Sequence, residues 1–472
     1  MDKLFNPSSI AVIGASNHPM KAGSIIVQNL LKKGFQGAIL PIHPSEAKIH
    51  GIEAYTTLES LEKDVDLVVL AMPARLIDQV MADIEAHVSK RNDVKYIVVA
   101  AADFAETRTE EGIRRQEVLM ETATRLGIRV MGPNCIGVIN NDKGVDTTFI
   151  ETKAKSEDRQ QGGISFISQS GSVASSILMM GDSAPAPMIF NKFISIGNMA
   201  DLDFIDFLNY LEQDETTRTI GIYLEGYAKG KELIETLSRI AKKKPIVVFK
   251  VGRSEIGAQA ASSHTGSMAG SDEIYTAAFR QYGIVQADTF EDLFDCLRAF
   301  DELPLPRDKR TYIYSQTGGF GTYTTDMIEV SGNVDITDIS EESSEKLRNM
   351  LPTFASVGNP PGYADITVAA SAEQHVDGLR IVLDDPAVSS VLFITVLPTF
   401  VDQKALGEQM VELLKKEKKP VYIVIMAGDF VLTSRSIIEG RSFPTFDNPL
   451  RAVRALARVN QYVEFHGFRE VE

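Results

Sequence analysis

Short apolar runs of strand length alternate with longer amphipathic segments along the chain. In the first third, the apolar runs lie at residues 10–14, 38–42, 66–72, 96–101 and 129–132. The segment between the first two runs carries Ile26, Leu30 and Leu31 at helical spacing and ends at Gly34, which predicts a helix with its stop signal. This alternation predicts an α/β fold in which helices cover parallel sheets, with a Rossmann-like unit at the N-terminus.

The same alternation continues through two further segments. Apolar runs of the second lie at 163–168, 190–197, 219–226 and 245–252, and those of the third at 311–316, 388–397 and 420–428. Two polar stretches, ETKAKSEDRQQGG and DELPLPRDKR, separate the three segments. We therefore expect three domains, at residues 1–150, 151–303 and 304–472, which agrees with roughly 150 residues per domain.

The second and third segments open on one motif. GISFISQSGSVASSIL and TYIYSQTGGFGTYTTDMI each predict a strand, a Ser-Gln-Ser/Thr-Gly turn and a helix start. The motif indicates a duplicated architecture, or two domains that reached the same turn independently. Unpaired N–H groups and the positive dipole end favour anions at a helix start. The candidate phosphate-binding residues are Ser170, Gly171, Ser172, Gly318 and Gly319. The alternative is that both turns only connect a strand to a helix.

A glycine turn also follows the first strand. Gly14, Ala15 and Ser16 come directly after it, and Gly23 opens the next helix. The spacing departs from G-x-G-x-x-G, and the second strand ends in PIHP without an acidic residue for a ribose hydroxyl. These features disfavour a dinucleotide and favour another phosphorylated ligand. Lys21 is either a phosphate partner or a solvated lysine.

The segment MGPNCIGVIN places Asn134 and Cys135 at the carboxyl edge of the first predicted sheet. Open α/β folds bind ligands at this edge. Cys135 is either a nucleophile or a small buried residue. The buried interpretation is favoured, because no histidine lies close to it in the sequence.

A lone histidine, His264, lies in the segment SSHTGSMAGSDEIY. A core histidine has apolar neighbours at regular spacing, and a zinc site has further ligands nearby. Neither pattern is present, so we expect no metal site and a loop that exposes the imidazole. A nucleophilic imidazole is normally oriented by a carboxylate on its other ring nitrogen. The candidate is Glu225, which follows the strand TIGIYL; the alternative is a solvated loop glutamate.

A helix is predicted directly after this loop. Asp272 and Glu273 suit its first turn, where carboxylates interact favourably with the helix dipole. Ile274, Ala277 and Ala278 are expected to form its apolar stripe.

Composition limits the classes of partner. The chain is 44% hydrophobic and 24% charged, without a run of about 18 apolar residues, so we expect no membrane span. The net charge of −16 repels phosphate backbones and anionic lipids, which excludes nucleic acid and membrane surfaces as expected partners. Two cysteines and a start without signal-peptide character predict a cytoplasmic protein.

On these motifs the chain resembles the α subunit of nucleoside-diphosphate-forming acyl-CoA synthetases of the acetate–CoA ligase type, which are related to succinyl-CoA synthetase. The resemblance covers nearly the whole length and rests on the His264 segment, GPNCIG, ISQSGS, IYLEG, GFQGAILPIHP and SQTGGFG. It implies a Rossmann-like CoA-binding domain followed by two flavodoxin-like domains, with the phosphohistidine loop in the first of these two.

The resemblance also implies a reaction. Acyl-CoA and phosphate would give an acyl phosphate and CoA, His264 would take the phosphoryl group, and phosphohistidine would pass it to ADP. Glu225 would orient the imidazole, while the two turns neutralise the phosphoryl group. No segment resembles an ATP-grasp domain and no P-loop is present. ADP and ATP with Mg²⁺ are therefore expected on an ATP-grasp β subunit, in an α2β2 heterotetramer.

The same resemblance assigns CoA to the first domain. The residues expected at the nucleotide end are Gly14, Ala15, Ser16, Lys21 and Pro44, and those near the thiol are Asn134 and Cys135. Two positions depart from the family pattern. The lysine of V-N-P-K is replaced by Ser45, and NPPGYAD lengthens the usual N-P-hydrophobic-D.

These departures leave alternatives open. One is a non-catalytic CoA- or acyl-CoA-binding regulatory protein of the same fold. Another is an NAD-dependent oxidoreductase that uses the first domain, which would require NADH to bind where we expect CoA.

Overall fold

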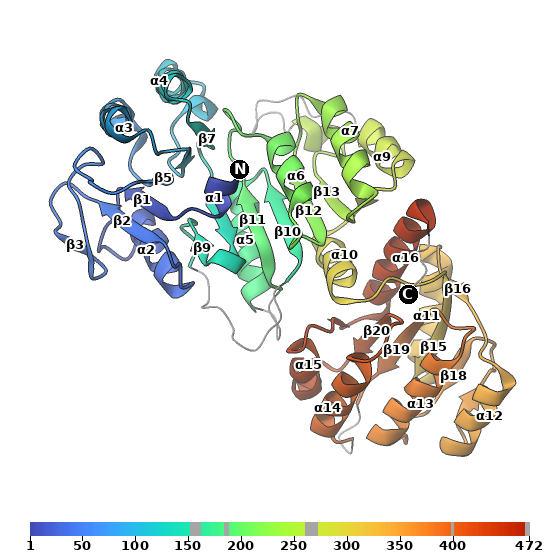
Figure 1. Ribbon diagram of the computed structural model, residues 1–472. Coiled ribbons are helices and arrows are strands. Elements are labelled where there is room, and N and C mark those ends of the chain that lie inside the picture. The colour runs from blue at the N-terminus through green and yellow to red at the C-terminus, as the bar shows by residue number, and fades with distance from the viewer. Residues whose placement is uncertain (152–161, 184–187, 260–271, 398–400, 468–472) are drawn as a thin grey trace. The chain divides into compact units, whose positions relative to one another are not determined.

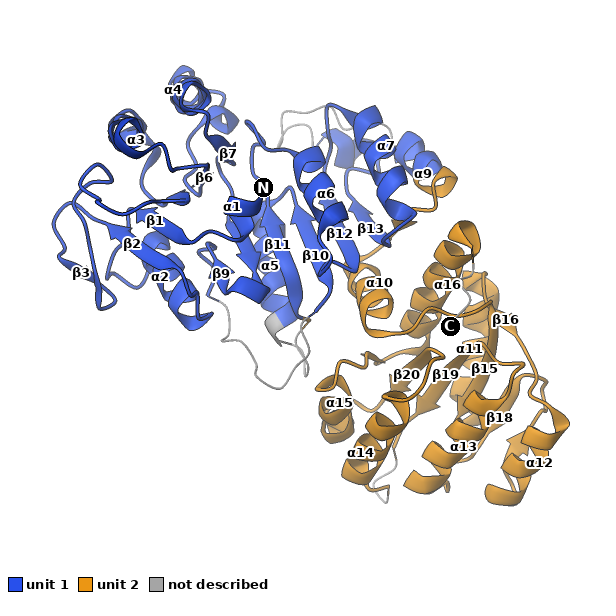
Figure 2. Ribbon diagram, in the orientation of Figure 1, with its two compact units in different colours: residues 1–157, 161–182, 189–278 blue, residues 158–160, 183–188, 279–472 orange. Residues whose placement is uncertain are grey.

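The computed structural model describes residues 1–151, 162–183, 188–259, 272–397 and 401–467 (Figure 1). The chain forms two compact units (Figure 2). Unit 1 comprises residues 1–157, 161–182 and 189–278, and unit 2 comprises residues 158–160, 183–188 and 279–472. Each unit is described by itself.

The first sheet of unit 1 is parallel and has the order β2-β1-β5-β6-β7. Its strands are β1 (Ser9–Ile13), β2 (Ala38–Ile42), β5 (Leu67–Leu70), β6 (Tyr96–Val99) and β7 (Arg129–Met131). Its helices are α2 (Ala22–Lys32), α3 (Ile77–Arg91) and α4 (Glu110–Leu126), while α1 (Asp2–Phe5) precedes β1 and a hairpin joins β3 (Lys48–Ile49) to β4 (Ile52–Glu53). All five predicted strands are present.

Helix α2 buries Ile26, Val27 and Leu30, as an amphipathic helix should. The prediction for Leu31 is wrong, because this side chain is 45% exposed. One residue beyond Leu30 turns about 100° around the helix and leaves the buried face. Gly34 ends the segment with φ of +71°, the left-handed conformation that glycine adopts most readily.

The second sheet of unit 1 has the order β13-β12-β10-β11-β8-β9. Its strands are β8 (Gly137–Asn140), β9 (Val145–Asp146), β10 (Ile164–Ser168), β11 (Phe190–Ser195), β12 (Thr219–Leu224) and β13 (Ile246–Lys250), and its helices are α5 (Gly171–Ser183), α6 (Phe204–Gln213) and α7 (Gly230–Ala241). Strand β8 follows the GPNCIG segment and pairs antiparallel with β11. The chain thus passes from the first sheet to the second before the polar stretch that begins at Glu151.

Helix α9 (Asp272–Gln281) begins with the predicted acidic turn, Asp272 and Glu273. The predicted apolar stripe is wrong: Ile274 is 69% exposed, whereas Tyr275 and Phe279 are buried. Tyr275 and Phe279 lie four residues apart and therefore share one face. Two rings bury more apolar area than an isoleucine with two alanines, so they decide which face is buried.

Unit 2 contains a sheet with the order β17-β18-β15-β19-β20-β21, and β16 also pairs with β15. Its strands are β15 (Arg310–Ser315), β16 (Asp335–Ile336), β17 (Ser356–Val357), β18 (Tyr363–Asp365), β19 (Ser390–Thr395), β20 (Val421–Ile425) and β21 (Thr445–Phe446), and strand β14 (Val285–Gln286) precedes them. Its helices are α10 (Phe290–Glu302), α11 (Gly318–Ser331), α12 (Glu341–Met350), α13 (Ala372–Asp384), α14 (Gln403–Leu414), α15 (Leu432–Glu439) and α16 (Pro449–His466).

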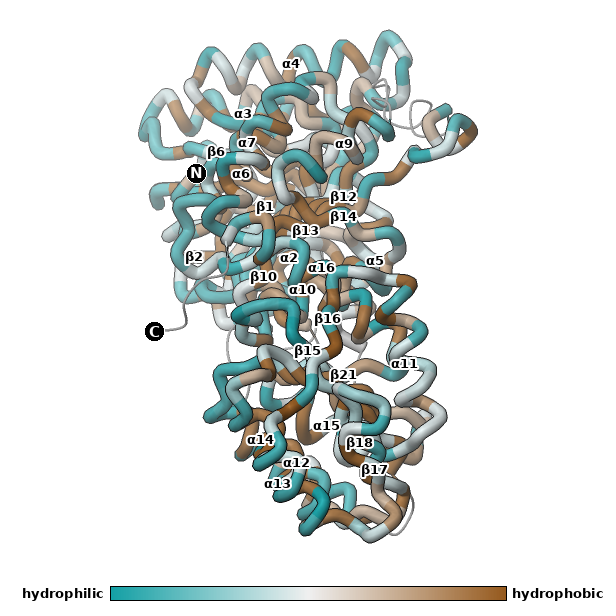
Figure 3. Tube along the Cα trace, turned by 90° about the vertical axis from the view of Figure 1, so that its right-hand side faces the viewer, coloured by the Kyte–Doolittle hydropathy of each residue, from teal (hydrophilic) through white to brown (hydrophobic). Residues whose placement is uncertain are grey.

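The sheets share one topology. In their main parallel strands, β1 lies between β2 and β5, β10 lies between β11 and β12, and β15 lies between β18 and β19. The first main strand of each sheet therefore has the second main strand on one side and the third on the other. Hydrophobic residues concentrate in strands such as β12 and β13, and hydrophilic residues are frequent on outer helices such as α13 (Figure 3). The predicted α/β fold with parallel sheets is confirmed. In this topology ligands bind at the carboxyl edge between the first and third strands, where the chain reverses its winding.

Candidate functional site

A cavity of about 700 Å³ opens at the carboxyl edge of the first sheet. Gly14, Ala15 and Lys21 line it from the turn after β1, and Pro44 lines it from the segment after β2. Met72, after β5, closes the opposite side. The cavity therefore lies at the expected reversal point. Its walls are mostly apolar and also include Lys21 and Asp83, so a lysine is available for the anionic part of a large ligand.

Two glycines allow the main chain to approach closely behind this cavity. Gly14 has φ of +91°, and a Cβ atom there would lie 2.6 Å from the Ala71 carbonyl oxygen. A Cβ at Gly23 would lie 2.1 Å from the Gly14 carbonyl oxygen. Helix α2 thus packs backbone to backbone against the turn after β1, and its first N–H groups lie near the ligand space.

Three other predicted residues do not line this cavity. Ser16 is 2% exposed, and its Oγ accepts a hydrogen bond from the His18 N–H at 3.1 Å. Asn134 is exposed, with φ of 56°. Cys135 is buried, its Sγ lies 3.3 Å from the Val99 carbonyl oxygen, and burial raises the pKa of its thiol to about 12. The buried interpretation of Cys135 agrees with this environment, because a nucleophilic thiol needs a lowered pKa.

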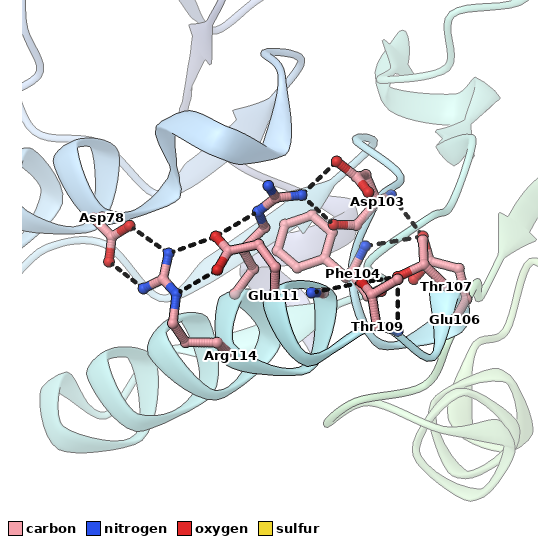
Figure 4. Close-up of polar contacts among 10 residues, drawn as sticks. Asp78, Asp103, Phe104, Glu106, Thr107, Thr109, Glu111 and Arg114 are labelled. Atoms are coloured by element: carbon pink, nitrogen blue, oxygen red, sulfur yellow. Dashed lines mark hydrogen bonds and ion pairs between the residues drawn. The ribbon is translucent and has the colours of Figure 1, made fainter.

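A hydrogen-bond chain holds Asn134 at the edge of the two sheets of unit 1. Its side-chain amide donates to Asn198 Oδ1 at 3.5 Å, and Asn198 Nδ2 donates to Glu106 at 2.6 Å. The other Glu106 oxygen accepts from the main-chain N–H groups of Asp103 and Phe104 (Figure 4). Arg114 on α4 pairs with both Asp78 and Glu111 in the same region (Figure 4). Glu106 therefore joins the loop after β6 to the loop after β11.

The second sheet carries the first Ser-Gln-Ser-Gly turn between β10 and α5. Helix α5 begins at Gly171, and the Ser170 and Ser172 hydroxyls lie 3.3 Å apart at its amino end. Ser168 Oγ donates to the Ser170 carbonyl oxygen at 2.8 Å. The predicted phosphate residues of this turn are thus together at one helix start, where N–H groups lack intrahelical partners.

Glu225 follows β12 beside this turn and is 6% exposed, so it is not a solvated loop residue. Gln169 joins the two segments: its Oε1 accepts from the Glu225 N–H at 2.9 Å and the Gly226 N–H at 3.2 Å, and its Nε2 donates to the Gly226 carbonyl at 2.8 Å. The buried Lys250 Nζ donates to the Glu225 carbonyl at 2.9 Å. His264 lies outside the described residues.

Gln169 and Lys250 were not predicted as site residues. Burial lowers the pKa of Lys250, while Asp272 and Glu225 act in the opposite direction. The repeated glutamine in the two Ser-Gln motifs was the available signal for Gln169. Nothing in the local pattern marked Lys250, which ends an apolar strand.

Unit 2 carries a matching turn between β15 and α11. Gln316 Oε1 accepts from the N–H groups of Val396 and Leu397 at 3.0 and 3.2 Å. Val396 therefore holds the position that Glu225 holds in unit 1. Gly318 lies against Asp365, since a Cβ at Gly318 would be 2.8 Å from Asp365 Oδ2. The two turns thus share the bonds from two N–H groups to the glutamine oxygen. Gln169 Nε2 also donates to a carbonyl, whereas Gln316 Nε2 has no partner among the described residues, and the two helix starts differ in their carboxylates.

Among the described residues, no group of three or more His, Cys, Asp or Glu side chains could hold a metal ion. In the same part of the chain, no helix has the length and apolar character needed to cross a membrane.

Two family models match the chain: a CoA-binding domain at residues 8–141 and a succinyl-CoA ligase-like flavodoxin domain at residues 161–300. The chain is 36% identical to the α subunit of ADP-forming acetate–CoA ligase II from Pyrococcus furiosus, over 95% of both chains. It is 32% identical to ADP-forming 4-hydroxybutyrate–CoA ligase from Nitrosopumilus maritimus, over 98% of this chain and 64% of that protein.

A solved structure is similar over nearly the full length. It is the dinucleotide-forming acetyl-coenzyme A synthetase 1 of Ca. Korarchaeum cryptofilum in complex with phosphate and ADP, with a TM-score of 0.88 and 32% identity. The match covers 98% of this chain and 97% of that chain.

The close contact at Gly23 predicts a large effect of one methyl group. Gly23→Ala should lower the free energy of unfolding by about 3 kcal/mol or more, because its Cβ meets main-chain atoms that cannot move aside. Gly34→Ala is the matched control at the other end of α2. It has positive φ but nothing within 4 Å, and should cost only about 1 kcal/mol. Urea unfolding measures both; equal losses would contradict the close-packing argument.

The burial of both cysteines predicts unreactive thiols. At pH 8 the native protein should react only slowly with a thiol reagent, because Cys135 and Cys296 are buried and burial raises both thiol pKa values. After denaturation both should react fully. Cys135→Ala should keep most of the turnover. A fast-reacting native thiol, or loss of turnover in this variant with its fold intact, would restore the nucleophile interpretation.

Proposed function

Because this chain belongs to the family of ADP-forming acetate–CoA ligase α subunits, we propose that it catalyses acyl-CoA + ADP + phosphate = carboxylic acid + CoA + ATP through an acyl phosphate and a phosphohistidine. Phosphate oxygen attacks the thioester carbonyl, and the thiolate leaves and is protonated as CoA. The imidazole nitrogen then attacks phosphorus and releases the carboxylate. The terminal phosphate oxygen of ADP finally displaces the imidazole and gives ATP.

The cavity at the first sheet is the proposed CoA site. Gly14, Ala15, Lys21 and Pro44 support this assignment, since they line a space with apolar walls and a lysine for phosphate. Ser16 remains a prediction for the nucleotide end, and Asn134 and Cys135 remain predictions near the thiol, with Cys135 as a buried wall residue. The CoA-binding family model over residues 8–141 supports CoA rather than NAD as the ligand.

The Ser170–Gly171 turn is the proposed site where the phosphoryl group reaches His264. The buried Glu225 carboxylate would accept a hydrogen bond from the N–H of the second ring nitrogen. In the neutral imidazole this selects the tautomer whose attacking nitrogen carries no proton. The N–H groups at the start of α5 would stabilise the charge on the phosphoryl oxygens. The Gly318–Gly319 turn is proposed as the second such place; there Asp365 adds a negative charge that a phosphoryl group must tolerate.

We propose three domains, at 1–150, 151–303 and 304–472. The support is that the main parallel strands form three sheets, with β1 to β7, β10 to β13 and β15 to β21 in the three regions, although β8 and β9 join the second sheet from the first region. The chain acts with a partner subunit, which we propose to be an ATP-grasp β subunit in an α2β2 heterotetramer that holds ADP or ATP with Mg²⁺. The support is that the relatives from Pyrococcus furiosus are named as α subunits, and that this chain spans 64% of the length of two other relatives. A cytoplasmic location is proposed as well, supported by the two free cysteines.

The observation that carries this function is the buried Glu225 joined by hydrogen bonds to the turn at the start of α5. His264→Asn should therefore abolish acyl-CoA-dependent ATP formation by the complex with its partner. CoA affinity, measured by calorimetry, should stay at the wild-type value. Continued ATP formation would overturn the phosphohistidine route. CoA binding with an inactive wild-type complex, across short, branched and aryl acyl-CoAs, would favour the regulatory alternative.

A further inference from the structure

We propose that Gln169 is a positioning residue that sets the direction of the Glu225 carboxylate, an inference that rests on the proposed function of Glu225. Gln169 is 8% exposed and lies on the turn between β10 and α5. Its carboxamide makes three hydrogen bonds to the main chain of Glu225 and Gly226, at 2.8 to 3.2 Å. One side chain thus ties the phosphate-binding turn to the residue that orients the histidine.

The Glu225 peptide is held from the opposite side as well. The Lys250 Nζ donates to its carbonyl oxygen at 2.9 Å, from the end of β13. Lys250 is 1% exposed, and its Nζ lies 5.5 Å from the centre of the Tyr275 ring. With the N–H held by Gln169 and the carbonyl held by Lys250, the main chain at Glu225 has little freedom to rotate. The Cα–Cβ direction of Glu225 is fixed in turn, and the backbone conformation limits the rotamers from which the carboxylate can act.

The matching turn of unit 2 has the same glutamine but no glutamate at the position of Glu225. Gln316 makes the equivalent bonds to the N–H groups of Val396 and Leu397, and Thr395 Oγ1 also donates to it at 2.7 Å. The same carboxamide therefore holds a valine in one turn and a glutamate in the other. Gln169 has no direct role in the reaction in this account, and its effect must depend on the carboxylate that it places.

This dependence gives a specific kinetic signature. A correctly placed carboxylate stabilises the imidazolium and raises the imidazole pKa. The attacking imidazole must be neutral, so the rate falls as the pH drops through that pKa. When Glu225 is misplaced, the imidazole pKa falls, and the acid limb of the pH–rate profile must move to lower pH. A general loss of stability does not move this limb.

The test is a double-mutant cycle on the complex with its partner, with the rate of acid-labile phosphorylation of His264 from ATP as the readout. Gln169→Leu and Glu225→Gln should each slow this step, by on the order of a hundredfold. The phosphorylation rate of the double variant should be within about twofold of that of Glu225→Gln alone. Once the carboxylate is absent, the hydrogen bonds of Gln169 no longer position a group that takes part in the reaction. Both single variants should shift the acid limb to lower pH, with CoA affinity unchanged.

Gln316→Leu is the matched control, because it removes the hydrogen bonds from the Val396 and Leu397 N–H groups to a glutamine oxygen, where no glutamate follows the strand. It should lower the melting temperature about as much as Gln169→Leu does, while the acid limb stays at the wild-type pH. Three results would overturn the positioning role but not the proposed function. They are a wild-type phosphorylation rate in Gln169→Leu, an acid limb that stays at the wild-type pH in this variant, and rate losses of Gln169→Leu and Glu225→Gln that multiply in the double variant. A wild-type complex that forms no phosphohistidine would overturn the proposed function, and the positioning role with it.

Discussion

The hydrogen bonds that join the turn after β10 to the loop after β12, and the turn after β15 to the loop after β19, determine what the rest of this molecule can do. At each of these places the chain reverses its winding, and two segments far apart in sequence must be fixed to each other. In the second sheet Gln169 fixes them with three hydrogen bonds through both ends of its carboxamide. In unit 2 Gln316 fixes them through its oxygen alone, which accepts from two N–H groups and the Thr395 hydroxyl. Without such a lock, the two segments would be ordinary surface loops with no defined mutual geometry.

In the first sheet, close backbone packing at two glycines fixes the corresponding segments, with no side-chain hydrogen bond of this kind among the residues that the structure describes. Gly14 brings its backbone against Ala71, and Gly23 brings α2 against Gly14, so the space in front stays open as a cavity. A bulky ligand fits such an open edge, whereas the glutamine-locked turns suit a small anion at a helix start. One topology thus offers a proposed site for CoA and proposed sites for a phosphoryl group. The position of Glu225, occupied in unit 2 by Val396, makes the two locked turns chemically unequal.

Much of this arrangement could be predicted from the sequence. The apolar runs predicted the main parallel strands, and the motifs around His264, Glu225 and the two Ser-Gln turns predicted the family, which the relatives confirm. The wrong prediction for α9 shows what periodicity alone does not determine. Tyr275 and Phe279 lie on one face of this helix and Ile274 on another, and packing against the rest of the chain determines which face is buried. The pairing of β8 with β11 and the bond from Lys250 to Glu225 join distant segments, so no local pattern contained them.

The central claim is that the phosphoryl group passes through one imidazole beside the locked turn of the second sheet. The most direct measurement is to incubate the complex with acyl-CoA and isotopically labelled phosphate, without ADP, and to locate the label by peptide mapping. The account predicts one base-stable, acid-labile phosphate on the peptide that contains His264, formed with release of CoA. Label on any other residue, or release of CoA with no labelled histidine, would contradict it.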